Sequence, residues 1–135
     1  MLRQADKTDR PPPGAARFEI ARDEIDARTR VISVEGDLDL SSAPQLKWTL
    51  LDSLEEGRSR LVLDLSPAAF MDSTALGVLI GVSRSLAVDA RLAIAGARGS
   101  VLNIFELSGM DAAFAMFATV EEALEYVRQD AAEDR

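Results

Sequence analysis

The chain has 135 residues, nearly half of them hydrophobic (47%), so it is long enough for one domain with a substantial core. Because it contains neither cysteine nor histidine, disulfides, thiolate metal sites and Ser-His-Asp catalysis are excluded. Its net charge of -8, from 15 basic and 23 acidic residues, would repel phosphate backbones and anionic lipids. Nucleic acid and membrane surfaces are therefore not expected partners.

The two ends of the chain differ in character from its middle. Residues 1–14 are polar and end in three prolines and a glycine, which predicts a disordered leader, and residues 131–135 predict a flexible charged tail. The leader lacks the apolar segment of a secretory signal, and no apolar run reaches the roughly 20 residues that span a bilayer. We therefore expect a soluble, cytoplasmic protein with a single domain over residues 15–130.

The predicted elements of this domain begin with a β-hairpin. Phe18 and Ile20 alternate with charged neighbours, and the segment 29–36 places Val31 and Ile32 on opposite faces. Both patterns are typical of strands. The short connection between the two segments predicts that the strands are antiparallel.

A helix is expected next. Ser42 and Gln45 have the spacing of a capping box, which predicts that the helix begins there. From Leu46 onward, leucines recur every four residues and form one buried stripe. Gly57 is a candidate left-handed residue that would end the helix.

Beyond this helix, short apolar runs alternate with helical patterns. The run 60–65 predicts a central strand, and residues 66–74 connect it to an apolar helix over 75–87, in which Gly77 and Gly81 have a spacing typical of close packing on a sheet. The segments 91–96, 100–109, 113–118 and 119–127 predict a strand, a helix, a strand and a helix. This order indicates an α/β fold with a mixed, mostly parallel sheet of about five strands, an N-terminal antiparallel hairpin and about four helices.

Four aspartates near predicted strand ends raise a metal or catalytic hypothesis. Asp37 and Asp39 follow the second strand, Asp64 is near the end of the third, and Asp72 precedes the apolar helix. Aspartate is common in turns because its carboxylate accepts hydrogen bonds from nearby backbone N–H groups, and we prefer this interpretation. A phosphoaspartate receiver would need a lysine after a late strand, whereas the only two lysines lie in the leader and on the first helix.

Three segments stand out: VEGDLDLSSAPQL, LVLDLSPAAFMDSTALGVLIG and IFELSGMDAAFAMFATVEEAL. Together they resemble the STAS family, and more narrowly the bacterial anti-sigma factor antagonists. The resemblance follows the family's order and extends from about Phe18 to Val127. The resemblance implies a protein that binds an anti-sigma factor, typically a serine kinase, and thereby frees a sigma factor. Phosphorylation by that kinase would abolish binding until a metal-dependent serine phosphatase resets the protein. On this view the chain is not an enzyme, and nothing in its sequence indicates a cofactor or metal.

The resemblance also assigns roles to individual residues. The phosphate acceptor in the family is the serine after the motif aspartate, here Ser73, with Thr74 as a less favoured second position. The expected docking surface for the partner consists of Asp37, Asp39, Ser41, Ser42, Asp72, Thr74, Ala75 and Gly77. The family usually has glycine where this chain has Ala75, so the alanine methyl group is expected to narrow the partner's access.

Several alternatives stay open at this point. The triplet of Asp72, Ser73 and Thr74 is also what a plain helix cap would look like, since all three residue types favour N-cap positions. A non-switching STAS scaffold, of the stressosome type or an accessory subunit of lipid transport, is the second hypothesis for function. A small enzyme is disfavoured by the missing histidine, and Trp48 is as compatible with ordinary packing as with a contact surface. The oligomeric state is not predicted.

Overall fold

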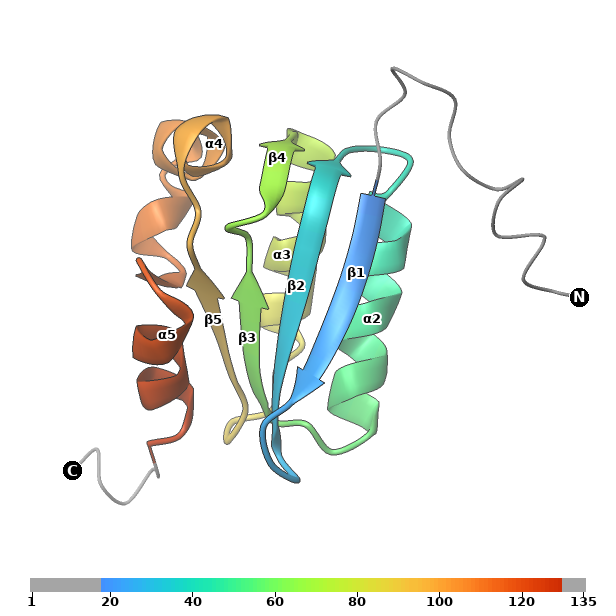
Figure 1. Ribbon diagram of the computed structural model, residues 1–135, viewed down its shortest axis with the longest axis vertical. Coiled ribbons are helices and arrows are strands. Elements are labelled where there is room, and N and C mark those ends of the chain that lie inside the picture. Colours follow the sequence, from blue (N-terminus) through green and yellow to red (C-terminus); the bar gives the residue numbers. More distant parts are fainter. Residues whose placement is uncertain (1–17, 130–135) are drawn as a thin grey trace, which may run out of the picture.

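The computed structural model describes residues 18–129, so the predicted leader (1–14) and tail (131–135) lie outside it. The elements are β1 (Phe18–Glu24), β2 (Thr29–Leu38), α2 (Ala43–Glu55), β3 (Arg60–Asp64), β4 (Ala68–Met71), α3 (Ser73–Arg84), β5 (Arg91–Ala95), α4 (Gly99–Ser108), the 3-10 helix η1 (Met110–Ala112), β6 (Ala115–Phe117) and α5 (Val120–Val127). They form one six-stranded sheet of order β1-β2-β3-β5-β6, with β4 paired to β2 (Figure 1). None of the helices between residues 18 and 129 is long and apolar enough to cross a membrane.

The predicted α/β class is confirmed, with one strand more than the sequence indicated. β1 is antiparallel to β2, and the remaining pairs are parallel. β3 pairs with the first half of β2, Thr29–Ser33, and β4 pairs with its end, Gly36–Leu38, after a register shift. The sequence predicts only a connection at β4, because the strand is four residues long and all four of its residues are apolar, so no alternation in polarity marks it.

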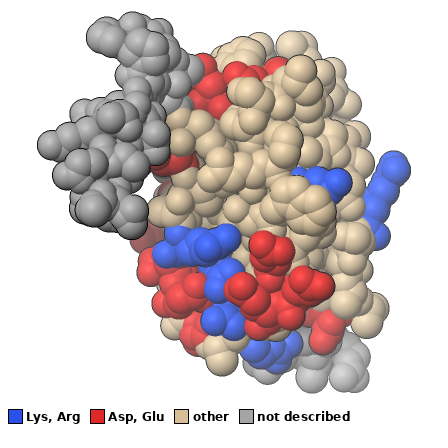
Figure 2. All heavy atoms as spheres, turned by 90° about the vertical axis from the view of Figure 1, so that its right-hand side faces the viewer, with Lys and Arg blue, Asp and Glu red and all other residues tan. Residues whose placement is uncertain are grey.

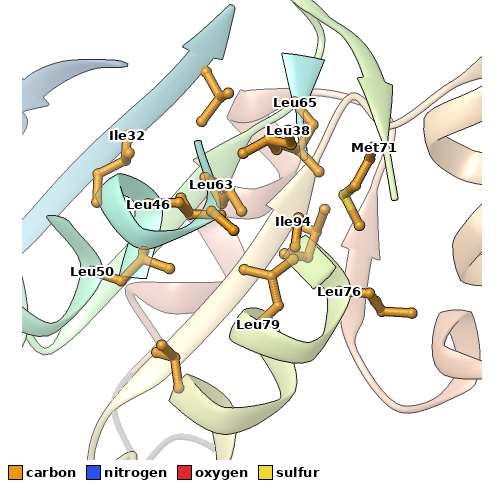
Figure 3. Close-up of a cluster of buried hydrophobic side chains, with 14 of the residues drawn as sticks. Ile32, Leu38, Leu46, Leu50, Leu63, Leu65, Met71, Leu76, Leu79 and Ile94 are labelled. Carbon is orange, nitrogen blue, oxygen red and sulfur yellow. The ribbon is translucent and has the colours of Figure 1, made fainter. Parts of the chain in front are cut away.

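Two hydrophobic clusters lie on opposite faces of the sheet. Helices α2 and α3 cover one face, and α5 covers part of the other (Figure 1). The alternation along β2 explains this arrangement, because Ile32 and Val34 belong to the larger cluster whereas Val31 packs with Ala123 and Val127 of α5. Figure 3 shows leucines of α2 and α3 meeting side chains from the sheet in the larger cluster. Each such fully buried side chain contributes about 1.5–3 kcal/mol, which fixes the two helices side by side on the sheet.

Most helix ends follow the sequence signals. Gly57 has a φ angle of 89°, the left-handed conformation expected after α2, and Gly109 ends α4 in the same conformation with a φ of 80°. At the start of α5 the Thr119 hydroxyl accepts a hydrogen bond from the Glu122 N–H at 3.2 Å.

The start of α2 differs from the prediction. Ser42 has the N-cap position, but its backbone is helical and its side chain makes no capping hydrogen bond. Its hydroxyl instead donates to the Asp37 carbonyl at 2.7 Å and accepts from the Asp39 N–H at 2.9 Å. The predicted capping box of Ser42 and Gln45 is therefore wrong, because the preceding turn uses the serine first.

A buried arginine joins the hairpin to the end of α2. The Arg30 guanidinium, only 6% exposed, donates to Glu24 at 2.8 Å, to the Ser53 hydroxyl at 2.8 Å and to Glu56 at 2.9 Å. Hydrogen bonds from Arg58 and then from Arg30 lower the pKa of Glu24. Figure 2 shows charged side chains gathered at the lower end of the face formed by α2 and β1, while the middle of this face is mostly uncharged.

We predict that Arg30→Ala lowers the free energy of unfolding by roughly 2 kcal/mol, because it removes a buried, packed side chain and three polar contacts at once. Urea denaturation followed by circular dichroism measures the change. Arg22→Ala is the matched control, since Arg22 is exposed on β1, and it should alter stability by less than about 0.5 kcal/mol. Equal losses of unfolding free energy in the two variants would show that the buried contacts of Arg30 do not stabilise the fold.

Candidate functional site

The end of β2 and the start of α3 lie side by side at one edge of the sheet. Leu38 and Met71 are register partners in the β2–β4 pair. One residue further on, the Asp72 N–H donates to the Leu38 carbonyl at 3.0 Å. This pairing brings the acidic turn after β2 next to the first turn of α3, two segments that are about 35 residues apart in the chain.

Asp72 is the residue that caps α3. It has an extended backbone, and its carboxylate accepts hydrogen bonds from the Thr74 N–H at 2.9 Å and the Ala75 N–H at 3.3 Å. Ser73 is the first helical residue and is exposed, and its hydroxyl makes no hydrogen bond within residues 18–129. The cap therefore accounts for Asp72 and leaves the Ser73 hydroxyl free for chemistry.

The turn after β2 holds a second ordered carboxylate. Asp39 accepts hydrogen bonds from the Ser41 hydroxyl at 2.8 Å, from the Ser41 N–H at 3.0 Å and from the Ser42 N–H at 3.2 Å. The pKa of Asp39 is lowered, first of all by the Ser41 hydroxyl, so this carboxylate stays negative at neutral pH. Asp37 lies in β2, one residue before its end, and is half-buried next to this turn.

Two residues expected on the docking surface are buried. Ser42 is 6% exposed and holds the turn from beneath. Ala75 is fully buried in the larger hydrophobic cluster. A partner therefore cannot reach either side chain, and the expectation that the Ala75 methyl group narrows access is wrong, because this methyl group points into the core.

The fourth aspartate has a structural role. Asp64 accepts hydrogen bonds from the Ser66 N–H at 3.0 Å and hydroxyl at 2.7 Å, and from the Ser33 hydroxyl at 3.4 Å. It stabilises the turn between β3 and β4. Across residues 18–129, no group of three or more acidic side chains is placed so that it could hold a metal ion. The observed hydrogen bonds are those of turn and cap residues.

A hollow of about 520 Å³ lies between α2 and α3. Its lining comes from Lys47 and Leu51 on α2 and from Thr74, Gly77, Val78, Gly81, Val82 and Ser85 on α3. A Cβ atom added to Gly77 or Gly81 would meet nothing within 4 Å, and both glycines are exposed. The prediction that these glycines bring α3 close to the sheet is therefore wrong, since they face the hollow.

Neither this hollow nor the position of Lys47 in its lining is predicted by the sequence. Neither α2 nor α3 alone indicates which of its exposed residues borders the other helix. Trp48 is 57% exposed, and the Lys47 ammonium lies 5.4 Å from the centroid of its ring. In the sequence, the only signal for such a position is the lysine next to a tryptophan in a helical pattern, and this signal does not indicate which other helix lies beside them.

Comparison with known proteins identifies related chains. Residues 21–123 match the family model of the STAS domain. The anti-sigma-F factor antagonist RsfB of Mycobacterium tuberculosis is 32% identical over 99 residues, which are 73% of this chain and 80% of RsfB. The crystal structure of an anti-sigma factor antagonist from Mycobacterium paratuberculosis superposes with a TM-score of 0.75 at 25% identity, covering 87% of this chain and 97% of the other.

The anti-sigma factor antagonist SpoIIAA of Bacillus has been solved in two forms. The unphosphorylated form has a TM-score of 0.71 at 28% identity, over 82% of this chain and 96% of SpoIIAA. The phosphorylated form has a TM-score of 0.64 at 26% identity, over 82% of this chain and all of the other. The family match spans most of the described residues, and the superpositions show that the fold is shared with these antagonists. The chain belongs to the STAS domain family.

Proposed function

We propose that this protein is an anti-sigma factor antagonist whose binding to an anti-sigma factor is switched by phosphorylation of Ser73. The observation that carries the proposal is the exposed Ser73 hydroxyl, which has no hydrogen bond within the described domain and sits on a helix start fixed by Asp72. The names of the relatives support the antagonist role, and the two solved forms of SpoIIAA support the switch.

Ser73 is favoured over Thr74 as the acceptor because of exposure. Thr74 is half-buried, its N–H is bonded to the cap, and it lines the hollow between α2 and α3. A kinase needs its acceptor hydroxyl to project into the kinase's own active site. The Ser73 side chain meets this requirement without a change in the backbone of α3.

The proposed reaction uses groups of the partner. The Ser73 oxygen forms a bond to the γ-phosphorus of ATP, the bond from that phosphorus to the β–γ bridging oxygen breaks, and ADP leaves while the hydroxyl proton passes to the kinase. The kinase is the anti-sigma factor itself or a serine kinase paired with it. A metal-dependent serine phosphatase then hydrolyses the phosphate ester. This exchange would occur in the cytoplasm, and the antagonist contributes only the acceptor and its surroundings.

The electrostatics of the site explain how one phosphate could prevent binding. A phosphate adds about -1.5 to -2 charges, and the N-terminus of a helix tolerates this charge because its N–H groups and dipole favour anions. Asp72 and Asp39 already make this edge negative. The added charge and bulk would repel a partner that fits the unmodified surface, with little change in the antagonist's fold. Without the buried Ser42 and Ala75, the proposed docking surface consists of Asp37, Asp39, Ser41, Asp72, Thr74 and Gly77.

We predict that incubation with ATP and the serine kinases of its own organism places one phosphate on Ser73. Mass spectrometry of proteolytic peptides locates the phosphate, and Ser73→Ala should abolish it. Thr74→Val serves as the matched control and should leave phosphorylation in place. If no cognate kinase modifies the chain, the switch is wrong and the non-switching scaffold becomes the better hypothesis.

We predict that Ser73→Asp weakens binding to the anti-sigma factor at least about tenfold, because it places a permanent negative charge beside Asp72. Its melting temperature should stay within about 2 °C of the native value, since an acidic residue in the first turn of a helix is favourable. Isothermal titration calorimetry and thermal denaturation measure the two effects. Ser100→Asp adds the same charge to the exposed first turn of α4 and should leave binding unchanged. A large loss of stability in Ser73→Asp would show that the site is structural.

A further inference from the structure

Lys47 has an unusual position for the one lysine in residues 18–129. It lies on the second turn of α2 and is the only charged residue that lines the hollow between α2 and α3. Thr74, the chain neighbour of Ser73, lines the same hollow from α3. The lysine ammonium contacts the exposed ring of Trp48. The Lys47 side chain and the first turn of α3 therefore border the same hollow.

We propose that Lys47 is the internal counter-ion of a phosphate on Ser73, and that phosphorylation draws its ammonium from the Trp48 ring to the phosphate across the mouth of the hollow. The inference rests on the proposed function for the presence of the phosphate. With Lys47 paired to the phosphate, the modified protein would present a narrowed hollow as well as an added negative charge.

The chemistry of the competing contacts favours the movement. A contact between an ammonium and an exposed aromatic ring is weak, whereas a phosphate offers nearly two negative charges and three strong acceptor oxygens. The lysine stem has four carbons and can rotate, and no ion pair holds its ammonium within residues 18–129. The transfer therefore breaks one weak contact and forms a charge-assisted one.

Other charged groups near the first turn of α3 do not replace Lys47. Asp37 at the end of β2, Asp39 in the turn that follows and Asp72 at the cap are acidic, and they would raise the pKa of a nearby phosphate. Arg98, at the start of α4, already donates to the Ser66 carbonyl at 3.2 Å, in the turn between β3 and β4. Arg84 lies in the last turn of α3, at the opposite end of the helix. Lys47 is the cation on the helix surface that borders the hollow.

The movement would change the surface that a partner meets. In the unmodified protein, Gly77 and Gly81 leave the backbone of α3 open to the hollow, and Leu51 and Val78 add apolar walls. With the ammonium drawn to Ser73, the end of the hollow nearest the acceptor would be occupied by a hydrated ion pair. Phosphorylation would then remove an apolar docking hollow in addition to repelling acidic groups.

The test uses the full chain with phosphoserine installed at position 73 during translation, so that no kinase is needed. A ³¹P NMR titration measures the second pKa of the phosphate. In Lys47→Met this pKa should be higher by about 0.5 than in the phosphorylated chain with Lys47, the size expected for one exposed ion pair, and Lys47→Arg should restore the lower value. Arg84→Gln removes one positive charge at the far end of α3 and should leave the pKa unchanged.

The fluorescence of Trp48, the only tryptophan in the chain, provides a second and independent measurement. Phosphoserine at position 73 should change its fluorescence in the chain with Lys47 and leave it unchanged in Lys47→Met. An equal phosphate pKa in the Lys47 and Lys47→Met chains, or an equal rise in Arg84→Gln, would overturn the proposal. Lys47→Gln repeats the test if Lys47→Met does not fold. Because the phosphate is installed without a kinase, failure of every kinase to modify Ser73 would overturn the proposed function and leave the ion pair standing.

Discussion

The hydrogen bonds from the Thr74 and Ala75 N–H groups to the Asp72 carboxylate fix where α3 begins, and the geometry of the candidate site depends on that start. Because the cap satisfies these two donors, Ser73 is not needed for the helix end and its side chain points to solvent. Two residues later the helix has turned Ala75 into the core. The Asp72 cap therefore determines that Ser73 lies at the surface and that Ala75 packs in the core.

Strand β4 gives this helix start its neighbours. It continues the sheet along β2 beyond the end of β3, and the Asp72 N–H bond to Leu38 follows directly from that pairing. The chain reaches β4 through the turn at Ser66, which Asp64 holds. Gly96 allows this turn to lie close to β5, since a Cβ atom there would be 2.7 Å from the Ser66 Cβ and the glycine has a φ of 74°. A glycine outside the site thus contributes to the position of the site.

Local patterns were sufficient for some features of the fold and insufficient for others. The alternation in β2 and the leucine stripe of α2 predicted a strand with two apolar faces and a helix with one buried side, because burial dominates at these positions. The short strand β4, the turn role of Ser42 and the exposure of Gly77 depend on segments that are distant in the sequence. The motif indicated where the site lies, but only the packing of α2 against α3 shows that a hollow borders it.

The division of roles between adjacent residues explains how a surface charge could act as a signal without affecting the fold. The groups that stabilise the helix start are a carboxylate and backbone N–H groups, whereas the modifiable hydroxyl contributes no bond of its own. Beneath them, Leu76 and Leu79 anchor α3 in the core and resist displacement of the helix by a change at its surface. A phosphate on Ser73, as proposed, would therefore act on whatever approaches this edge of the sheet. The arrangement is suited to control binding through charge and shape at the surface, without requiring a change in the backbone of the domain.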